Sequence, residues 1–159
     1  MGAVRRFGVA CAAIALALDQ ASKALALAAT PRLAGGVEIL PVFDLVLVRN
    51  SGVSFGLLGS VPWPALAFIG LIIVAILAAW LWRVQTRLLA GALGLVIGGA
   101  LGNVLDRARS GAVTDFLDFH LAGYHWPAFN LADIAVVAGT GLLLLGNWRT
   151  TERPERTAA

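Results

Sequence analysis

The stretch "FNLADIAVVAGTGLLLLGNW", residues 129–148, decides the fold, because it is apolar enough for a membrane helix and still holds an aspartate. A helix that spans a bilayer core needs about 20 predominantly apolar residues. An ionisable side chain at membrane depth costs about 3 kcal/mol or more, so such a residue is usually paired or used. Asp133, in the second turn of this stretch, therefore predicts a functional site whose other members lie elsewhere in the chain.

The composition indicates a membrane protein along the whole chain. The 159 residues are 59% hydrophobic and only 13% charged, which leaves too little polar surface for one compact soluble unit. We predict an all-α polytopic membrane protein with four transmembrane helices, at about residues 7–29, 61–82, 88–105 and 129–148. These spans form a single membrane domain, residues 1–159.

Arginines predict the orientation of these spans. They precede the first span, join the second to the third, and follow the fourth, so both termini are expected in the cytoplasm. The tryptophans agree with this topology, since Trp63 and Trp126 fall at the outer ends of spans and Trp80, Trp82 and Trp148 at inner ends. The net charge of +3 comes from single flanking arginines and not from a basic patch, so we expect no nucleic-acid partner.

Three features of the sequence suggest other functions but have simpler interpretations. The N-terminus imitates a secretory signal, yet Asp19 and Lys23 interrupt its apolar run, so we expect an uncleaved span. Cys11 excludes an internal disulfide and is expected to be a small buried hydrophobe. His120 and His125 lack a further ligand pattern, so we expect no metal and place both at the solvent or the interface.

The segments outside the spans differ in character. Residues 30–60 contain "VEILPVFDLVLVRNSGVSFGLL", whose β-branched alternation predicts a small β-rich segment on the outer face. The "RNSG" at residues 49–52 is interpreted as the turn of a hairpin. The second outer segment, residues 108–126, is short and polar-aromatic, and the tail, residues 150–159, is expected to be disordered.

Glycines punctuate the third span every four residues, at Gly94, Gly98 and Gly102. This spacing lays them on one helix face and lets a neighbouring helix approach closely. The "GGALGN" run is not a phosphate loop, because no strand precedes it and no Gly-Lys-Ser/Thr follows.

Helical rise converts sequence position into depth, at about 1.5 Å per residue across a core of roughly 30 Å. Measured from the inner face, Asp19 lies at about 18 Å, Lys23 at about 24 Å, Asn103 at about 22 Å and Asp133 at about 21 Å. Three helices thus bring polar side chains to one level in the outer half of the membrane. Just outside follow Asp106, Arg107 and Asp115.

Several of these residues admit a structural interpretation beside a functional one. Asp19 and Lys23 are one helical turn apart, so they either neutralise each other or contact a substrate. Asp106 and Arg107 are interpreted as a helix-end ion pair. Interhelical hydrogen bonding is the structural alternative for two carboxamides, Asn103 and Asn130.

The two aspartates of the second outer segment have different predicted roles. Asp118 is interpreted as merely solvated. Asp115 is held between apolar residues of "VTDFLDF", beside the boundary at which Asp133 lies, so this pair favours catalysis over a structural role.

Four ordered blocks resemble one family, the lipoprotein signal peptidases, also called signal peptidase II. They are "DQASK" at residues 19–23, "VRNSGVSFGLL" at 48–58, "GGALGNVLDRARSGAVTDFLDF" at 98–119 and "FNLADIAV" at 129–136. The resemblance covers nearly the whole chain. The family's pattern matches at each key position; only Thr114 is commonly more apolar.

The resemblance implies an aspartic endopeptidase that cuts diacylglyceryl-modified prolipoproteins just before the lipidated cysteine. Its catalytic aspartates match Asp115 and Asp133. The substrate-binding or supporting positions match Asp19, Lys23, Asn50, Gly52, Phe55, Gly56, Asn103, Asp106, Arg107 and Asn130. We accordingly expect no cofactor and no metal, a monomer whose partners are prolipoproteins and membrane lipids, and residence in the bacterial cytoplasmic membrane with the site near the outer face.

Two other function classes compete with a protease. A proton-coupled transporter or channel would place charges near the midplane, often in two related halves, whereas the acids here crowd one face. A structural scaffold would tolerate loss of both carboxylates, which an aspartic protease cannot. Paired replacement of Asp115 and Asp133 by amides therefore discriminates the scaffold from the protease.

Overall fold

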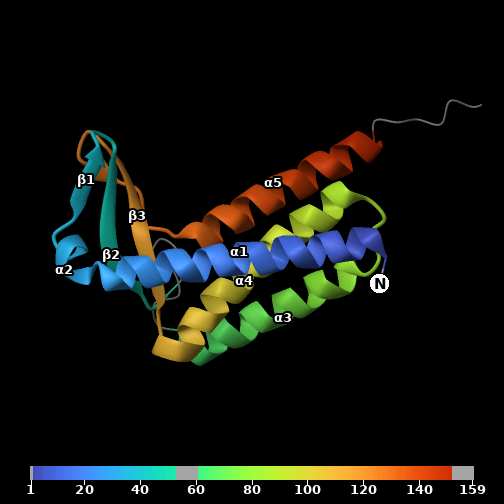
Figure 1. Ribbon diagram of the computed structural model, residues 1–159, viewed down its shortest axis with the longest axis horizontal. Helices are drawn as coiled ribbons and strands as arrows, with labels where there is room; N and C mark the ends of the chain where they lie inside the picture. Colours follow the sequence, from blue (N-terminus) through green and yellow to red (C-terminus); the bar gives the residue numbers. More distant parts are fainter. Residues whose placement is uncertain (1, 53–60, 152–159) are drawn as a thin grey trace, which may run out of the picture.

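A bundle of helices with a small sheet at one end makes up the protein. The computed structural model describes residues 2–52 and 61–151, with side chains described through residue 146. Its long helices are α1 (Ala3–Ala28), α3 (Trp63–Leu81), α4 (Arg87–Ser110) and α5 (Leu131–Thr151). The start of α1 and the last turn of α5 lie at the end of the bundle opposite the sheet (Figure 1). The predicted mostly helical architecture with a small β segment is confirmed.

Three of the described helices, α1, α3 and α4, are long and apolar enough to cross a membrane. The apolar part of α5 within the described residues, Leu131–Gly146, is shorter, so the fourth span stays a prediction. α5 continues to Thr151, two residues into the tail predicted to be disordered; residues 152–159 lie outside the described part of the chain.

Helix α4 continues to Ser110, five residues beyond the end predicted for the third span at residue 105. Gly111 then closes the helix in the left-handed conformation, with φ 71° and its N–H donated to the Arg107 carbonyl at 2.9 Å. Asp106 and Arg107 consequently lie within the last helical turns and not in a loop.

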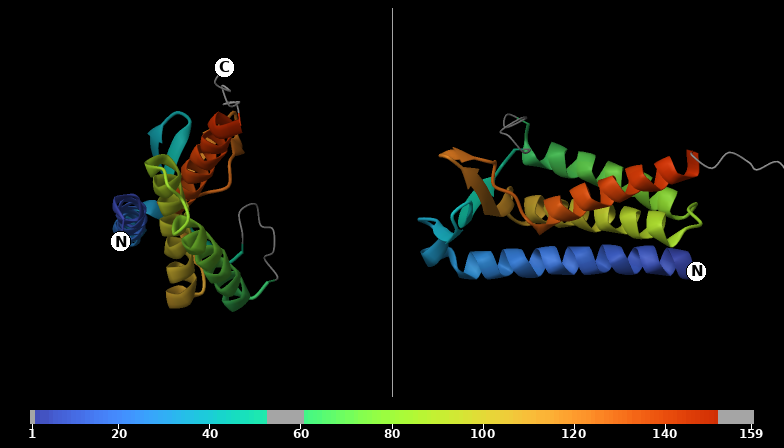
Figure 2. Two further views of the ribbon diagram at one scale, coloured as in Figure 1. Left: turned by 90° about the vertical axis from the view of Figure 1, so that its right-hand side faces the viewer. Right: turned by 90° about the horizontal axis from the view of Figure 1, so that it is seen from above.

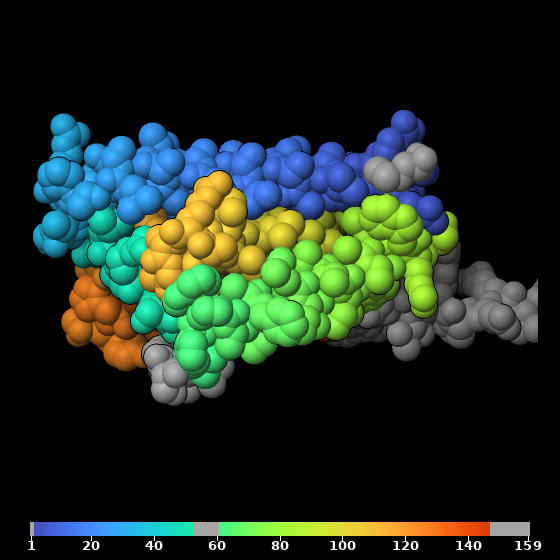
Figure 3. Space-filling view, turned by 90° about the horizontal axis from the view of Figure 1, so that it is seen from below, coloured from blue at the N-terminus to red at the C-terminus, as the bar shows by residue number. Residues whose placement is uncertain are grey.

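Helix α4 is the centre of the bundle and packs against α1, α3 and α5 (Figure 2). The space-filling view shows α1 along one side of α4 and α3 along the other (Figure 3). The predicted glycine face is confirmed: a Cβ at Gly94 or Gly98 would collide with the backbone carbonyl of Gly8 or Ala12 in α1. The two backbones therefore approach closely along this face.

The sheet is antiparallel throughout, with strand order β1-β2-β3-β4. Its strands are β1 (Val37–Leu40), β2 (Phe43–Asn50), β3 (Val113–Leu121) and β4 (Tyr124–His125). The short helix α2 (Thr30–Leu33) leads from α1 into β1. Leu33 packs with Ala26 of α1 and Phe116 of β3 in one buried cluster, which fixes the sheet to the end of α1.

Two expectations about the sheet are wrong. The hairpin reverses at residues 41–42, and Arg49 and Asn50 belong to β2, where they pair with Thr114 and Val113 of β3. Pairing with β3 extends β2 to Asn50, so the chain bends only at Ser51 and Gly52, where the Gly52 N–H donates to Asn50 Oδ1 at 3.1 Å. Residues 108–126, for which no strand is predicted, supply the inner strand β3. The run after Gly52 lies outside the described residues.

Strand β3 carries a bulge beside the site. The backbone N–H groups of Phe116 and Leu117 both donate to the Phe129 carbonyl, at 3.0 and 2.9 Å. Two residues facing one is the pattern of a β-bulge, and it shifts the alternation of side chains by one residue. Asp115 and Asp118, three residues apart, therefore line the same groove.

Candidate active site

Asp133 lies at the first turn of α5 because it helps to start that helix. Its Oδ2 accepts the backbone N–H of Asn130 at 3.2 Å, and its own N–H donates to Asn130 Oδ1 at 3.1 Å. This reciprocal arrangement is a capping box, with aspartate in place of the usual glutamate or glutamine. The helix dipole also favours a carboxylate at this end. Hydrogen bonds of the helix cap thus position Asp133, the acid in the apolar stretch.

Asp115 lies on β3 and is almost fully buried, with 2% of its surface exposed. Its Oδ2 accepts from Asn50 Nδ2 at 2.9 Å and its Oδ1 from Asn130 Nδ2 at 2.6 Å. Burial raises the pKa of the Asp115 carboxyl; the hydrogen bonds from Asn50 and Asn130 lower it and the charge of Asp133 raises it, and the net shift is upward. Asp115 therefore holds a proton more readily than an ordinary aspartate.

Asn130 connects the two acids, since its side chain donates to Asp115 and its backbone N–H to Asp133. Asn103 of α4 adds a second support: its Nδ2 donates to Asp133 Oδ1 at 2.9 Å, and its Oδ1 accepts from Asn130 Nδ2 at 3.3 Å. We call Asp115 and Asp133 the dyad. Each acid is held by carboxamides from a different element.

A second group, the ion cluster, consists of Asp19, Lys23 and Asp106 and lies beside the dyad. Lys23 Nζ contacts Asp19 Oδ2 at 2.9 Å and Asp106 Oδ2 at 3.0 Å, and donates to Asn103 Oδ1 at 3.0 Å. Asp19 is fully buried, and its Oδ1 accepts the N–H of Ala132 at 2.9 Å. The expected pairing of Asp19 with Lys23 is confirmed, and the cluster also supports the first turn of α5.

Arg107 does not form the ion pair with Asp106 that the sequence suggests. Asp106 points to Lys23 and accepts the Thr114 N–H at 3.1 Å. The Arg107 guanidinium instead donates to the carbonyls of Gly52, at 2.8 Å, and Asn103, at 3.3 Å. Consecutive residues on a helix point about 100° apart, so each finds its own partner.

The end of β2 is thereby fixed against α4. Gly52 donates its N–H to Asn50 Oδ1 at 3.1 Å while its carbonyl accepts from Arg107. Asn50 is in this way oriented toward Asp115. Two further predicted positions, Phe55 and Gly56, lie outside the described residues.

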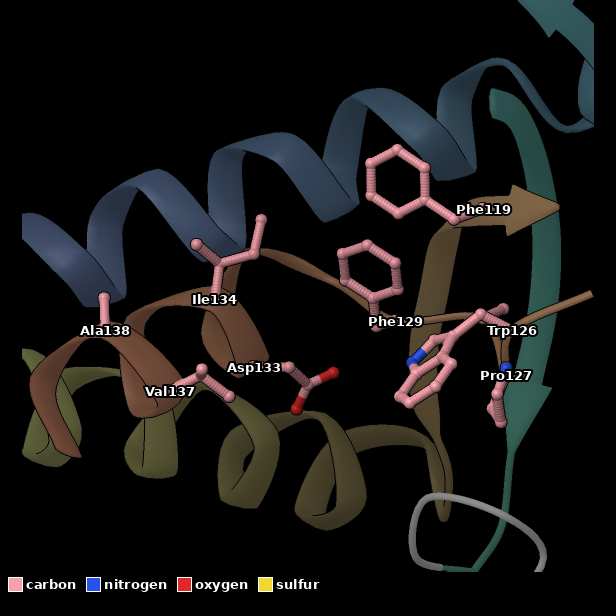
Figure 4. Close-up of a pocket in the computed structure, with 9 residues that line it drawn as sticks. Phe119, Trp126, Pro127, Phe129, Asp133, Ile134, Val137 and Ala138 are labelled. Carbon is pink, nitrogen blue, oxygen red and sulfur yellow. The ribbon is translucent and has the colours of Figure 1, made fainter. Parts of the chain in front are cut away.

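Two grooves meet at the dyad. The apolar groove has a volume of about 710 Å³ and is lined by Phe119, Trp126, Pro127, Ala128, Phe129, Asp133, Ile134, Val137 and Ala138. Figure 4 shows the Asp133 carboxyl pointing from α5 across this groove toward Trp126. The polar groove has about 660 Å³ and is lined by Val46, Val48, Arg49, Asn50, Ser51, Gly52, Asp115, Asp118, His125, Trp126, Pro127 and Ala128. Residues 126–128 line both grooves. Asp133 faces the apolar groove and Asp115 faces the polar groove.

Asp118 is paired and not solvated, contrary to the prediction from the sequence. Its side chain is buried and its Oδ2 contacts His125 Nδ1 at 2.7 Å. His120 Nε2 lies 3.2 Å from Asp44 Oδ1, and the two imidazoles stack with centroids 4.9 Å apart. The two-residue spacing of Asp118 and His120 is a signal that both lie on one face of a strand. Their partners, His125 and Asp44, are identified only by the strand pairing. Within residues 2–52 and 61–151 no group of three or more His, Cys, Asp or Glu side chains is placed to hold a metal ion.

Comparison with known proteins points to one family. The family model for signal peptidase (SPase) II matches residues 11–149. A lipoprotein signal peptidase of Nitrobacter hamburgensis is 46% identical over 155 residues, covering 92% of this chain and 94% of that protein. The lipoprotein signal peptidase of Syntrophotalea carbinolica is 44% identical over 144 residues, covering 87% and 88%.

Solved structures agree with the sequence relatives. A structure described as a bacterial membrane enzyme superimposes with a TM-score of 0.82 at 26% identity, covering 96% of this chain and 93% of that one. A second structure with the same description gives a TM-score of 0.74 at 28% identity, covering 88% and 91%.

Proposed function

Because the chain belongs to the signal peptidase II family of membrane proteases, which process lipoproteins, we propose that Asp115 and Asp133 form the catalytic pair of an aspartic endopeptidase. Its substrate is a prolipoprotein whose cysteine carries diacylglycerol, and the bond cut is the one just before that cysteine. Removal of lipoprotein signal peptides is the activity of the family; the aspartic chemistry and the exact bond are our proposal.

One observation carries the aspartic chemistry: a single residue, Asn130, donates to both acids. Two carboxyls held together by neutral donors cannot both ionise cheaply, so one keeps a proton. The ionised acid takes a proton from water as the water oxygen attacks the scissile carbonyl carbon. The protonated acid gives its proton to the carbonyl oxygen, which leaves a geminal diol. The proton taken from water then passes from the other acid to the amine nitrogen as the C–N bond breaks, and one diol hydroxyl returns a proton to the first acid. The raised pKa of Asp115 supports this shared proton, although a coupled pair titrates as a unit.

The neighbouring groups support this chemistry without taking part in it. The carboxamides of Asn50, Asn103 and Asn130 hold the acids at 2.6 to 2.9 Å, and an amide neither gives up nor accepts a proton at neutral pH. Water reaches the dyad through the polar groove, which Asp115 lines.

We also propose four spans, with both termini in the cytoplasm and the dyad near the outer face of the bacterial cytoplasmic membrane. The start of α1 and the last turn of α5 lie at one end of the bundle, as an even number of crossings requires (Figure 1). Cysteines placed at Ala159 and at Gly123, in a chain with Cys11→Ala, should react with impermeant reagents from opposite sides. Reaction of both from outside would contradict this topology.

The proposed substrate is tested with the purified chain and two prolipoproteins that differ only in diacylglycerol. We expect cleavage before the cysteine of the lipidated form, located by mass spectrometry. The unmodified form should be cleaved at least about tenfold more slowly, since acyl burial contributes about 0.8 kcal/mol per methylene. Equal rates for the two forms would show that the enzyme does not recognise the lipid. Cleavage at another bond would contradict the proposed cleavage before the cysteine.

A further inference from the structure

The polar groove contains a group that the proposed chemistry does not use. Asp118 and His125 form a close pair on its wall, and Asp118 is directly opposite Asp44 across the β2–β3 pairing. Like charges directly opposite in a sheet are unfavourable. Each carboxylate has one imidazole as its neighbour, His120 for Asp44 and His125 for Asp118.

The grooves differ in the chemistry that they can accept. The apolar groove continues down α5 along Ile134, Val137 and Ala138 (Figure 4). The polar groove instead lies on the sheet, where Arg49, Asp115, Asp118 and His125 contribute charged or ionisable groups. A prolipoprotein has the same asymmetry, because an apolar signal segment precedes the scissile bond and a water-soluble chain follows the lipidated cysteine.

The scissile bond must lie between Asp115 and Asp133 if the dyad is catalytic, so this inference rests on the proposed function. A chain that passes between the acids leaves on one side into the apolar groove and on the other into the polar groove. The residues that follow the cysteine then run along the sheet past Asp118. We propose that the polar groove is the binding site for the first residues of the mature chain, and that the Asp118–His125 pair selects for their charge.

The sign of this selection follows from the charges in the groove. Arg49 keeps its charge but lies away from Asp118: it pairs with Thr114, four residues before Asp118 on β3, and its guanidinium donates to the Ser110 carbonyl at 2.9 Å and to Thr114 Oγ1 at 3.4 Å. The Asp118 carboxylate places a negative group on the part of the groove wall that follows Asp115 along β3. Asp118 Oδ1 is buried and has no hydrogen-bond partner among the described residues, so this oxygen can accept from a bound substrate. A lysine after the cysteine is therefore favoured and an aspartate is disfavoured.

His125 is the accessible half of the pair. Its side chain is 55% exposed while that of Asp118 is 11% exposed, and its Nδ1 is taken by the carboxylate. An imidazole held in this way presents Nε2 to its surroundings. His125 thus contacts the substrate directly, and Asp118 acts both through it and by its charge.

The test compares three diacylated prolipoprotein peptides that carry Lys, Gln or Asp directly after the cysteine and are otherwise identical. For the wild-type chain we expect kcat/KM to fall in the order Lys, Gln, Asp, with about a tenfold ratio between the first and the last. Asp118→Asn should bring that ratio close to one. His125→Gln, which leaves the Asp118 carboxylate in place, should keep the ratio or increase it.

Glu38→Gln is the matched control, because it removes the same charge from an exposed position of the same sheet outside the groove. It should preserve the wild-type ratio. A ratio of one in the wild-type chain, or a ratio unchanged by Asp118→Asn, would overturn the assignment of the polar groove. Absence of cleavage of all three peptides would instead contradict the proposed function. Ratios within one variant are independent of how much of it folds, so a destabilised Asp118→Asn chain remains informative.

Discussion

Two pairs of carboxylates lie at the same end of the bundle and differ in what compensates them. Asp19 and Asp106, in the ion cluster, share the ammonium of Lys23 at 2.9 and 3.0 Å. Asp115 and Asp133, in the dyad, accept hydrogen bonds from carboxamides, and the described residues contain no ion pair with either. A shared cation keeps carboxylates ionised, whereas amide donors fix their position and leave protonation free. The first arrangement suits structure and the second suits proton transfer.

The largest expected effect comes from removing one acid of the dyad. Asp115→Asn and Asp133→Asn should each lower cleavage of a diacylated prolipoprotein by at least about 1000-fold, because an amide cannot relay the proton that the mechanism needs. Both chains should fold, since Asn at position 133 still offers an oxygen to the capping box. Gel-based cleavage assays measure the loss.

The double variant provides the control for this pair. Since the two acids act as one unit, Asp115→Asn with Asp133→Asn should be hardly slower than either single variant. Near wild-type turnover by either correctly inserted single variant would refute the dyad and reopen the scaffold interpretation.

Removing the cation of the ion cluster should lower the stability of the protein. Lys23→Met leaves Asp19 and Asp106 buried without their cation, and breaking a buried ion pair in this way costs about 3–5 kcal/mol. We expect a large fall in the free energy of unfolding, measured by thermal unfolding in detergent, with Asp133→Asn as the comparison. A Lys23→Met chain that keeps its stability but loses kcat would place Lys23 in the chemistry and erase the distinction between the two regions.

A smaller effect on cleavage is expected when Asp115 loses its hydrogen bond from Asn50. Asn50 donates to Asp115 and lowers the pKa of that carboxyl, so Asn50→Ala should raise the pKa further. Loss of one supporting hydrogen bond should slow cleavage by about tenfold at neutral pH. Because the pKa of Asp115 rises, at least one limb of the kcat/KM–pH profile should move to higher pH. Because a coupled pair titrates as a unit, movement of either limb shows that the dyad titrates in catalysis. Two unmoved limbs would contradict that role.

The smallest effect is expected at the opposite end of the bundle. Thr86 caps α4 there by accepting the Leu89 N–H at 3.4 Å. Thr86→Ala should cost about 1 kcal/mol of stability and leave kcat unchanged, because the cap is remote from both carboxylate pairs. A change in kcat would show that the two pairs are coupled to the whole length of α4.

Helical periodicity predicted the convergence of the site well. A constant rise per residue predicts one depth for Asp19, Asn103 and Asp133, and their hydrogen-bonded network confirms that they meet. That depth in the membrane and their catalytic or supporting roles stay predictions. This worked because a helix has one geometry along its whole length. The extension of α4 past residue 105 depended on a cap at Gly111 that hydropathy does not detect.

The sheet was predicted less well, because its partners are distant in sequence. β2 pairs with β3 across more than 60 residues, and no local pattern in "RNSG" or "VTDFLDF" identifies that partner. The bulge at Phe116 and Leu117 also interrupts the alternation by which a strand is recognised. Asp118 was therefore interpreted as solvated, although β3 and β4 bury it beside His125.

The glycine face of α4 has a consequence for the enzyme's lipid environment. At Gly102 a Cβ would strike the carboxyl of Asp19, so the close approach of α1 and α4 extends up to the ion cluster itself. Two helices interlocked in this way cannot slide to follow a thinner or thicker bilayer, and mismatch must be met by tilt or by deformation of the lipid. The height of the dyad is then a property of the protein, while the height of the scissile bond in the proposed lipid-anchored substrate is a property of the membrane. If the proposed function holds, we expect hydrocarbon thickness to affect turnover without any change in sequence.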